Sequence, residues 1–492
     1  MSVLTRTHRL FLAIELREAS TTTGLYQQQT GKMLPIDPQI EFTPARSQRN
    51  INQRSLTQKS SLSGVRIGTA RYGLEMVGGT FPAQFGNSLR CCSFVDEPLG
   101  RFTIGAVSGT FRHGERVDQA SSGAWGTIVS DVWDGDAVLW VAQDFQLGAG
   151  VFDGTGQLVG ASSGATATPS AFVDDGGSAW WPYSYRTSRM LFDATGLLVP
   201  VTAGDVLKGM SSDAVATVFA SQIAGANAEV MIQRQHNHFT GSEVVRNQTT
   251  GQANIGTLAA NGFEVAIRGT TASIGVVKDQ IREEIEWARG NVTLEGTIGE
   301  PLIFGFDFLG KDRGTDDRGD SVQPDFTGMA VPPLFLGADL KIGYANDPNS
   351  ALKSKCIRSF NLDMGHEVAI QDCAALNADH GPFFVETPLG VDMAMIVGRS
   401  PTLSLDPYLA PDADFPWMEA WRENRPLRMK LTVGSEARNK FTISIPSMIP
   451  SQIDTGDFDG ISVRNVTLAL DGGNAPGPRG DNEVVIVQDY FA

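Results

Sequence analysis

The chain has few cysteines and no long apolar run. Its 492 residues include four cysteines, and Cys91 and Cys92 are adjacent. Adjacent cysteines rarely form a bridge, and no C-x-x-C pair occurs, so we expect reduced, structural cysteines rather than a disulfide scaffold. No apolar run approaches the roughly 18 to 20 residues of a membrane span, and LFLAI at 10–14 is too short for a signal-peptide core. We therefore expect a chain that is made in a cytoplasm and has no membrane partner.

Positive charge is scarce and concentrated in one segment. The formal net charge of −16 argues against ordinary nucleic-acid binding, which needs a basic surface. Residues 42–74 contain no Asp or Glu and hold the basic residues Arg46, Arg49, Arg54, Lys59, Arg66 and Arg71. A basic arm on an acidic body is either a nucleic-acid tail or a strap that docks on an acidic copy of the same chain. The arm lacks the interleaved aromatic residues of a single-strand binder, which favours the strap.

A short pattern recurs in the first half of the sequence. The letters ASSGA stand at 120–124, within GERVDQASSGAWGTI, and again at 161–165. Weaker copies follow at 204–218 and 239–251, at offsets of 90 and 128 from the first copy. Irregular spacing between related copies predicts short β units joined by loops of variable length.

The remaining pattern is also that of a mainly β protein. The 54 glycines and 24 prolines separate short runs rich in β-branched residues. In PLIFGFDFLG the alternation places Leu302, Phe304, Phe306 and Phe308 on one face of a strand. Residues 412–424 predict one helix that packs on a sheet through Phe415, Met418 and Trp421. In contrast, 19–66 reads as a long polar stretch with few apolar anchors.

No constellation of catalytic or metal-binding residues can be assembled from the sequence. The SSGA serines lack a G-x-S-x-G elbow, so a turn of small residues is the better interpretation. His236 and His238 would share a strand face but have no evident third metal ligand. RGDS at 318–321 is a three-letter match in an acidic loop, and DTGDFDG at 454–460 lacks the spacing of a calcium loop. We expect no cofactor, no metal and no enzymatic activity.

Several segments, taken in order, resemble the major tail tube proteins of long-tailed, siphovirus-like bacteriophages. They include GVRIGTARYGLEMVGG with FGNSLRCCSF, then ARGNVTLEGTIGEPLIFGFDFLG, and later VPPLFLGADLKIG, FPWMEAWREN and DFDGISVRNVTLAL. The resemblance covers about 66–100 and 266–492 and omits 101–265. It implies a mainly β fold of two tail-tube-type β-sandwich domains with a flanking helix, plus an inserted β-repeat module.

The resemblance also implies a domain plan. The first tube domain would take residues 1–100, with the long basic arm at 19–66, and continue at 266–325 with a linker. The repeat module would occupy 101–265, and the second tube domain 326–492. The acidic, glycine-bearing stretch at 311–325 is the expected boundary.

The function implied is structural. The chain would be a tail tube subunit, assembled in the host cytoplasm and located in the virion tail, whose stacked rings form the channel for DNA. Trimeric rings with pseudo-sixfold symmetry are favoured and hexameric rings remain open. Other implied partners are the tape measure protein and phage DNA in the lumen, without specific binding, and the tail terminator and tail tip proteins. Inter-ring contacts would come from Arg46, Arg49, Arg54, Lys59 and Arg66. Alternatives are a tail fibre or decoration protein that binds host-surface glycans, and a polysaccharide-degrading enzyme with paired carboxylates.

Overall fold

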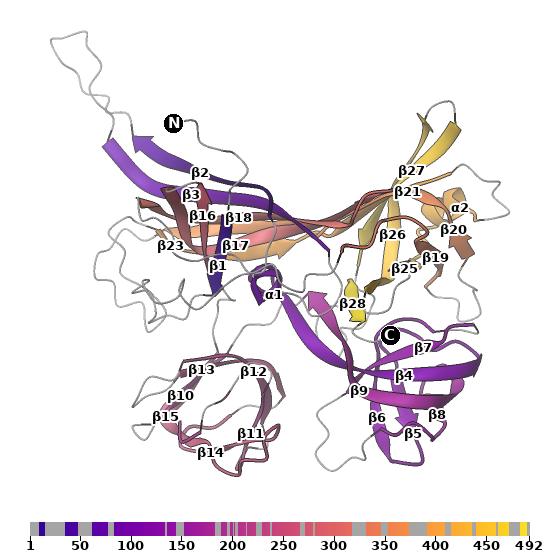
Figure 1. The fold of residues 1–492 in the computed structure, drawn as a ribbon, viewed down its shortest axis with the longest axis horizontal. Coiled ribbons are helices and arrows are strands. Elements are labelled where there is room, and N and C mark those ends of the chain that lie inside the picture. The colour runs from indigo at the N-terminus through magenta and orange to yellow at the C-terminus, as the bar shows by residue number, and fades with distance from the viewer. Residues whose placement is uncertain are drawn as a thin grey trace, which may run out of the picture.

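The computed structural model contains a β-rich body and two β-barrels (Figure 1). It describes residues 9–14, 35–47, 62–76, 83–132, 135–143, 152–182, 188–193, 197–199, 201, 205–212, 214–222, 229–236, 239–265, 271–278, 281–316, 331–345, 353–372, 391–408, 415–434, 439–458, 461–471 and 483–489. Within these ranges there are 28 strands and two short helices. The prediction of a mainly β protein is confirmed. No helix in the described ranges is long and apolar enough to cross a membrane.

The first barrel follows helix α1 (Ala83–Cys91) in the chain. Its strands are β4 (Phe94–Ser108), β5 (Arg116–Gln119), β6 (Ala124–Ile128), β7 (Val138–Gln143), β8 (Leu158–Gly160) and β9 (Thr166–Pro182). Antiparallel pairing runs β4–β7–β6–β5–β8–β9 and returns from β9 to β4. Buried aromatic rings, including Phe102 and Phe152 in edge-on contact, fill the interior. The pairing ring closes on itself, although β8 pairs with only Thr166 and Ala167 of the long strand β9.

The second barrel has the same pairing ring with its halves in the opposite chain order. Its strands are β10 (Ser188–Phe192), β11 (Val206–Gly209), β12 (Val215–Gln222), β13 (Glu229–His236), β14 (Val244–Asn247) and β15 (Gly256–Val265). They close in the order β10–β13–β12–β11–β14–β15. The two barrels have the same order of paired strands if β10 to β12 are matched with β7 to β9, and β13 to β15 with β4 to β6. The three strands that come first in the second barrel thus correspond to the three that come last in the first barrel.

The four sequence repeats are four hairpin turns of these barrels. They join β5 to β6, β8 to β9, β11 to β12 and β14 to β15. The serines at 121–122, 162–163 and 211–212 lie in these turns, so the prediction of a turn of small residues is confirmed. Gly123, Gly164 and Gly251 end three of them with φ of 70°, 66° and 74°, a left-handed conformation that favours glycine.

A buried glutamate holds one serine turn in each barrel. In the first barrel, Glu115 accepts hydrogen bonds from the hydroxyls of Ser162 and Ser163, both at 2.8 Å. In the second, Glu243 accepts from the hydroxyls and backbone N–H groups of Ser211 and Ser212. Burial raises the pKa of Glu243, but these hydrogen bonds and one from the Thr240 N–H outweigh it and leave that pKa below its usual value. Each carboxylate therefore joins the two halves of its barrel.

The body consists of two halves with the same strand order. The first half contains β1 (Arg9–Ile14), β2 (Pro35–Ser47), β3 (Leu62–Glu75), α1 (Ala83–Cys91), β16 (Ala272–Lys278), β17 (Ile281–Thr297) and β18 (Ile303–Asp316). It pairs in the order β1–β16–β17–β18–β3–β2. Both barrels lie in the chain between α1 and β16.

The second half repeats this plan without barrels. It contains β19 (Asp339–Tyr344), β21 (Ile357–Asp363), β24 (Thr402–Pro407), α2 (Trp417–Arg422), β25 (Leu427–Val433), β26 (Lys440–Phe458) and β27 (Ile461–Leu470). It pairs in the order β19–β25–β26–β27–β24–β21. In both halves the helix follows the third of these strands. Additional strands are β20 (Lys353–Lys355), β22 (His366–Asp372), β23 (Val391–Arg399) and β28 (Val485–Asp489).

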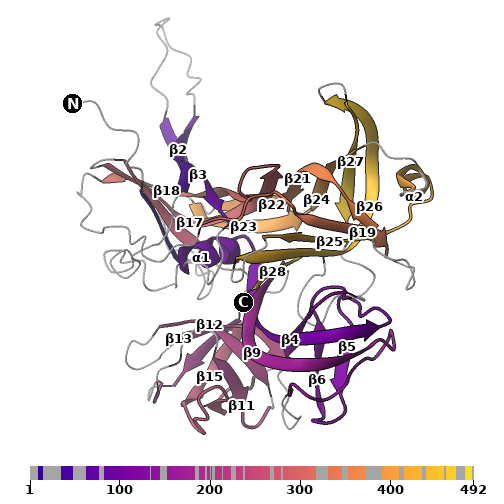
Figure 2. The same cartoon turned by 45° about the vertical axis from the view of Figure 1, so that its right-hand side comes forward.

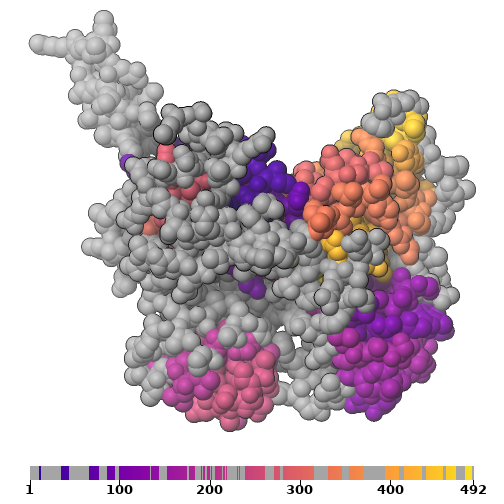
Figure 3. All heavy atoms as spheres, in the orientation of Figure 1, coloured from indigo at the N-terminus to yellow at the C-terminus, as the bar shows by residue number. Residues whose placement is uncertain are grey.

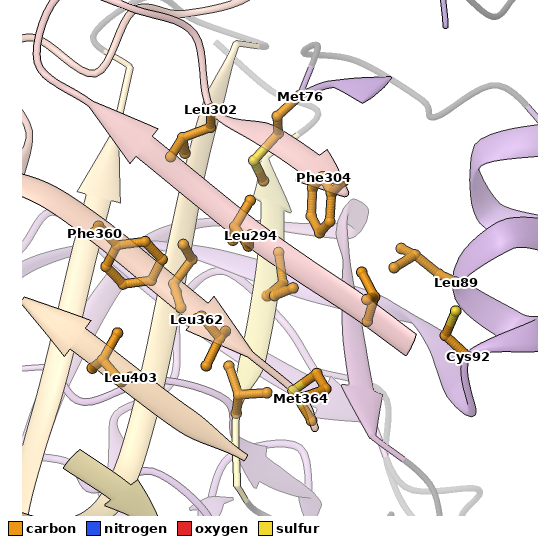
Figure 4. Close-up of a cluster of buried hydrophobic side chains, with 14 of the residues drawn as sticks. Met76, Leu89, Cys92, Leu294, Leu302, Phe304, Phe360, Leu362, Met364 and Leu403 are labelled. Carbon is orange, nitrogen blue, oxygen red and sulfur yellow. The ribbon is translucent and has the colours of Figure 1, made fainter. Parts of the chain in front are cut away.

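One hydrophobic core spans both halves. Figure 4 shows Leu294 and Phe304 of the first half in the same cluster as Phe360 and Leu403 of the second. The predicted face of β18 is confirmed, because Leu302, Phe304, Phe306 and Phe308 are all buried. Cys92, beside α1, is part of the same core, and burial raises the pKa of its thiol. Burying this much apolar surface is the main stabilising term of such a fold.

Three sequence predictions need correction. The helix expected over 412–424 is shorter, and its buried residues are Trp417 and Ala420, whereas Trp421 is exposed. The polar stretch 19–66 contains strand β2 and the start of β3, because a hairpin edge tolerates polar side chains on its open face. The expected linker at 311–325 begins inside β18, which extends to Asp316, and 317–325 lies outside the described residues.

Candidate assembly and channel surfaces

A single antiparallel sheet connects the two halves of the body. Near the end of β17, Thr293 pairs with Asp363 of β21, and the pairing continues to Thr297 and Ser359. This joint creates a continuous strand order, β2–β3–β18–β17–β21–β24–β27–β26, which we call the long sheet. Figure 2 shows its strands running side by side across the body. The long sheet contains four strands from each half.

Hydrogen bonds of half-buried and buried polar groups connect the two halves at the joint. The Asn291 side chain donates to Asp363 at 2.7 Å and accepts from the His366 backbone N–H at 2.9 Å. The His366 Nδ1 lies 3.2 Å from the Gly290 carbonyl, which requires a proton on Nδ1 for a hydrogen bond. His366 is 8% exposed. Burial, then the positive charge of Arg399, lowers its pKa to about 3, so the ring is neutral in the folded chain at neutral pH.

We expect the joint to weaken in mild acid. Because the folded-state pKa of His366 is depressed, the unfolded chain takes up more protons below about pH 6.5. The histidine contribution to the unfolding free energy is then complete above pH 6.5 and falls by about 1.4 kcal/mol per pH unit as the pH approaches 3. Chemical unfolding between pH 7 and 4 measures this slope. His366→Asn, which keeps a donor for Gly290, should show a shallower slope; equal slopes would contradict the assignment.

The two faces of the long sheet differ in character. One face is apolar and covers the core, with Leu74, Leu294, Phe304, Leu405 and Val466 among its buried residues. The alternating positions form the opposite face, here called the polar sheet face. Its polar residues in the described ranges are Gln39, Glu41, Thr43, Thr69, Arg71, Glu75, Thr293, Glu295, Thr297, Asp307, Ser359, Asn361, Asp363, Thr402, Ser404, Asp406, Gln452, Asp454, Asn465 and Thr467, all exposed or half-buried. Ile303, Leu309 and Ala469 occupy positions on the same face, opposite Glu75, Thr69 and Thr402. Its polar side chains carry hydroxyl, amide and carboxylate groups, with one arginine.

The electrostatic balance of the polar sheet face is negative. Its arginine, Arg71, forms a 3.1 Å ion pair with Asp307 on the neighbouring strand. Arg358, at the bulge of β21, pairs with Asp406 at 3.8 Å. The other carboxylates of the face, including Glu41, outnumber these arginines. An anionic surface of this kind repels phosphate groups.

The long sheet ends in two open strand edges. In the described residues, β2 pairs with β3 alone. At the other end, β26 pairs with β25 over 427–433 and with β28 over 485–489, but both contacts involve its first part, up to Met448. Residues 449–458 of β26 pair with β27 and with no other described strand. The Trp421 indole of α2 donates to the Ser451 carbonyl at 3.3 Å, so the open part of this edge is residues 452–458. Unpaired edges of this length are templates for pairing with another chain.

The predicted basic contact residues fall partly on one of these edge hairpins. Arg46 lies in β2 next to Ser47, which pairs with Leu62, and Arg46 itself pairs with Ser63. Arg66 lies in β3 and is exposed. Arg49, Arg54 and Lys59 lie outside the described residues. The structure therefore brings Arg46 and Arg66 onto one hairpin. No sequence pattern indicated the β26 edge at the other end.

The other motifs form no site in the described part of the chain. His236 is in β13, its side chain is not described, and His238 and the RGDS stretch lie outside the described residues. No group of three His, Cys, Asp or Glu residues placed to hold a metal ion occurs in the described ranges. Asp454 and Asp457, from the stretch compared with a calcium loop, lie in β26.

The first barrel is attached to the body by a shared strand and a buried ion pair. Strand β28, buried along its length, pairs with β26 on one side and with β9 of the barrel on the other. Arg428 and Asp131 form an ion pair at 3.2 Å, and their side chains are 6% and 8% exposed. The Lys430 ammonium donates to the Asp131 carbonyl at 3.0 Å and pairs with Asp136 at 3.2 Å. Burial lowers the pKa of Lys430, and Asp136 partly offsets this.

No known protein family matches the chain. No curated protein matches it either. Functional argument for this protein therefore depends on its own geometry.

Proposed function

We propose that the chain is a structural subunit that assembles into rings, and that stacked rings form the tail tube of a long-tailed bacteriophage. The observation that carries the proposal is the long sheet, which has one open edge from each half of the body. Copies related by a rotation would pair β26 of one chain with β2 of the next. This closes the sheet into a barrel and removes the open edges. Each half would correspond to one tail-tube-type domain, and no catalytic step is assigned.

The joint inside the chain supports a specific register between chains. Phe304, which pairs with Leu294 and Leu74, corresponds to Val466, which pairs with Ile453 and Leu405. We aligned the two halves on these core residues and followed their paired strands outward. In this alignment Thr293 of the first half corresponds to Gln452 of the second, and Asp363 of the second half corresponds to Gln39 of the first. Because Thr293 pairs with Asp363 inside the chain, Gln452 should pair with Gln39 of the next copy.

The favoured ring is a trimer with pseudo-sixfold symmetry. Each chain supplies two similar halves, so three chains supply six. A hexamer of chains would need a far wider channel, with twice the number of strands. The polar sheet face would line the channel, where its carboxylates repel DNA and let it slide without specific binding.

The remaining partners follow from the same proposal. The tape measure protein and DNA would occupy the lumen, and the tail terminator and tip proteins would cap the tube. The barrels, seen as separate masses below the body in Figures 1 and 3, would project from the tube wall. Arg49, Arg54 and Lys59 are proposed to strap one ring to the acidic surface of the next.

Paired cysteines test the register directly. We expect Gln39→Cys with Gln452→Cys to give disulfide-linked dimers and trimers on mild oxidation, because opposite residues of antiparallel strands lie within disulfide reach. Both side chains are exposed. Non-reducing gel electrophoresis measures the products. The matched control combines Gln39→Cys with Ser404→Cys, which is on the polar sheet face but two strands from the β26 edge, and it should remain monomeric on the gel.

Electron microscopy of the purified protein tests the function itself. Rings or tubes with a central channel are expected. Monodisperse monomers under all assembly conditions, together with no cross-linking of the cysteine pair, would overturn the proposal.

A further inference from the structure

Each half of the body carries a hairpin that extends beyond the core of the long sheet. In the first half it is formed by the distal parts of β2 and β3, where pairing continues to Ser47 and Leu62. In the second half, β22 continues from β21 and β23 leads into β24, and their pairing extends to Asp372 and Val391. We call these the first and second hairpins. They occupy corresponding positions in the two halves.

The two hairpins have opposite charge. The strands of the first hairpin beyond Thr43 carry Arg46 and Arg66 and no acidic residue. The strands of the second carry Glu367, Asp372 and Asp392, and their one basic residue, Arg399, forms a 2.7 Å ion pair with Glu483. The sequence between the strands continues each sign, with Arg49, Arg54 and Lys59 in the first and Asp379 and Glu386 in the second.

The second hairpin lies across the first half of its own chain. Strand β23 is in contact with β17, β18 and β3, and β22 is in contact with β17 and β18. The His366 ring anchors it at the Gly290 carbonyl, and the Met364 N–H donates to Val292 at 3.1 Å. The acidic hairpin thereby reaches β3, which is a strand of the basic hairpin and carries the exposed Arg66.

The strands of the second half that correspond to β17, β18 and β3 are β26, β27 and β24. In the described residues, neither hairpin makes a comparable contact with β26 or β27. The acidic residues near this place include Asp471, at the end of β27, and Glu367, at the start of the second hairpin, and both are exposed. A basic hairpin docked here would meet opposite charge.

We propose that the first hairpin of one copy docks across β26, β27 and β24 of the next copy in the same ring, and that its opposite charge fixes this order of neighbours. The inference rests on the proposed ring. It assigns Arg46 and Arg66 to contacts within a ring, with Asp471 and Glu367 of the adjacent copy, and leaves Arg49, Arg54 and Lys59 to contacts between rings. Because basic and acidic hairpins would alternate around the ring, each one lies between two of opposite sign.

Charge reversal in both partners tests the docking. We expect Arg46→Glu with Arg66→Glu to raise the protein concentration needed for half-maximal ring formation roughly tenfold or more, because like charges then face each other. Asp471→Lys with Glu367→Lys should have a similar effect. The four substitutions together should restore assembly to within about threefold of the wild type. Sedimentation velocity measures ring formation, and thermal unfolding of each variant checks that the subunit remains folded.

A third variant separates this contact from the strap. Reversal of Arg49, Arg54 and Lys59 to Glu should leave single rings unchanged and shorten the tubes. If rings form and tolerate reversal of Arg46 and Arg66, or if the combined variant is no better than the single reversals, the docking is wrong while the ring proposal stands. If the wild type forms no rings, the proposed function itself fails.

Discussion

A proline in the open edge of β26 is expected to give folded monomers that no longer form rings. Asp454 and Thr455 lie in the part of β26 that pairs with β27 alone among the described strands. Successive backbone N–H groups of a strand point to opposite sides, so one of these two residues donates toward β27 and the other toward the open edge. Proline removes the donor and its ring obstructs a neighbouring strand.

The two substitutions should therefore differ. The variant that loses an edge donor should keep nearly the wild-type unfolding midpoint and show no rings by sedimentation or microscopy. The other should be destabilised, because it loses a hydrogen bond to β27. Asp454→Ala and Thr455→Ala are the matched controls, since they remove the side chain but keep the N–H, and both should assemble. Normal rings from a folded proline variant at each position would show that this edge is not used.

Local patterns predicted individual strands of this protein well. Alternation placed Leu302, Phe304, Phe306 and Phe308 on one face, and all four are buried. The repeated small residues predicted turns, which Ser162, Ser163 and their counterparts form. Such signals succeed because they depend on neighbours in sequence, where the two-residue period of a strand decides which side chains reach the core.

The joint and the edges could not be predicted in this way. Pairing of Thr293 with Asp363 depends on where two distant strands end, and neither sequence segment records it. The β2 strand was missed because Gln39 and Glu41 are polar residues on an exposed face, so its apolar content is low. The predicted buried face of α2 was wrong because Phe415 precedes the helix. The helical positions that face the core are therefore those of Trp417 and Ala420. The sequence alone thus predicts individual strands and turns. The candidate assembly and channel surfaces depend on long-range strand pairing, which only the structure shows.

The order of the barrel strands is a further case of this limit. The repeats at 114–128 and 239–251 are related, and so are those that hold Ser162 and Ser211, but their order along the chain is reversed between the barrels. In each barrel one half supplies the glutamate and the other supplies the serine turn that the glutamate holds. Either chain order gives this arrangement, because the pairing ring is the same.

Removal of the Asp131 carboxylate should loosen the first barrel from the body without preventing ring formation. Asp131→Ala leaves the Arg428 guanidinium buried beside an empty site, since both side chains are less than one-tenth exposed. Breaking one partner of a buried ion pair typically lowers the free energy of unfolding by about 3–5 kcal/mol. The Lys430 contact to the Asp131 backbone carbonyl is retained, whereas the hydrogen bond that the Asp131 carboxylate accepts from the His113 backbone N–H is lost together with the Arg428 ion pair.

A double substitution separates the charge from the packing. Asp131→Leu with Arg428→Met removes both charges and should cost less than Asp131→Ala, because the buried Arg428 charge is removed together with the carboxylate that it faces. Urea unfolding followed by tryptophan fluorescence is a suitable measurement, since Trp140 and Trp180 lie near β28 and β9. The ion pair is formed outside the long sheet, so both variants should still form rings at subunit concentrations where they are folded. Loss of rings in the folded double variant would mean that the barrel, and not only the sheet edges, takes part in assembly.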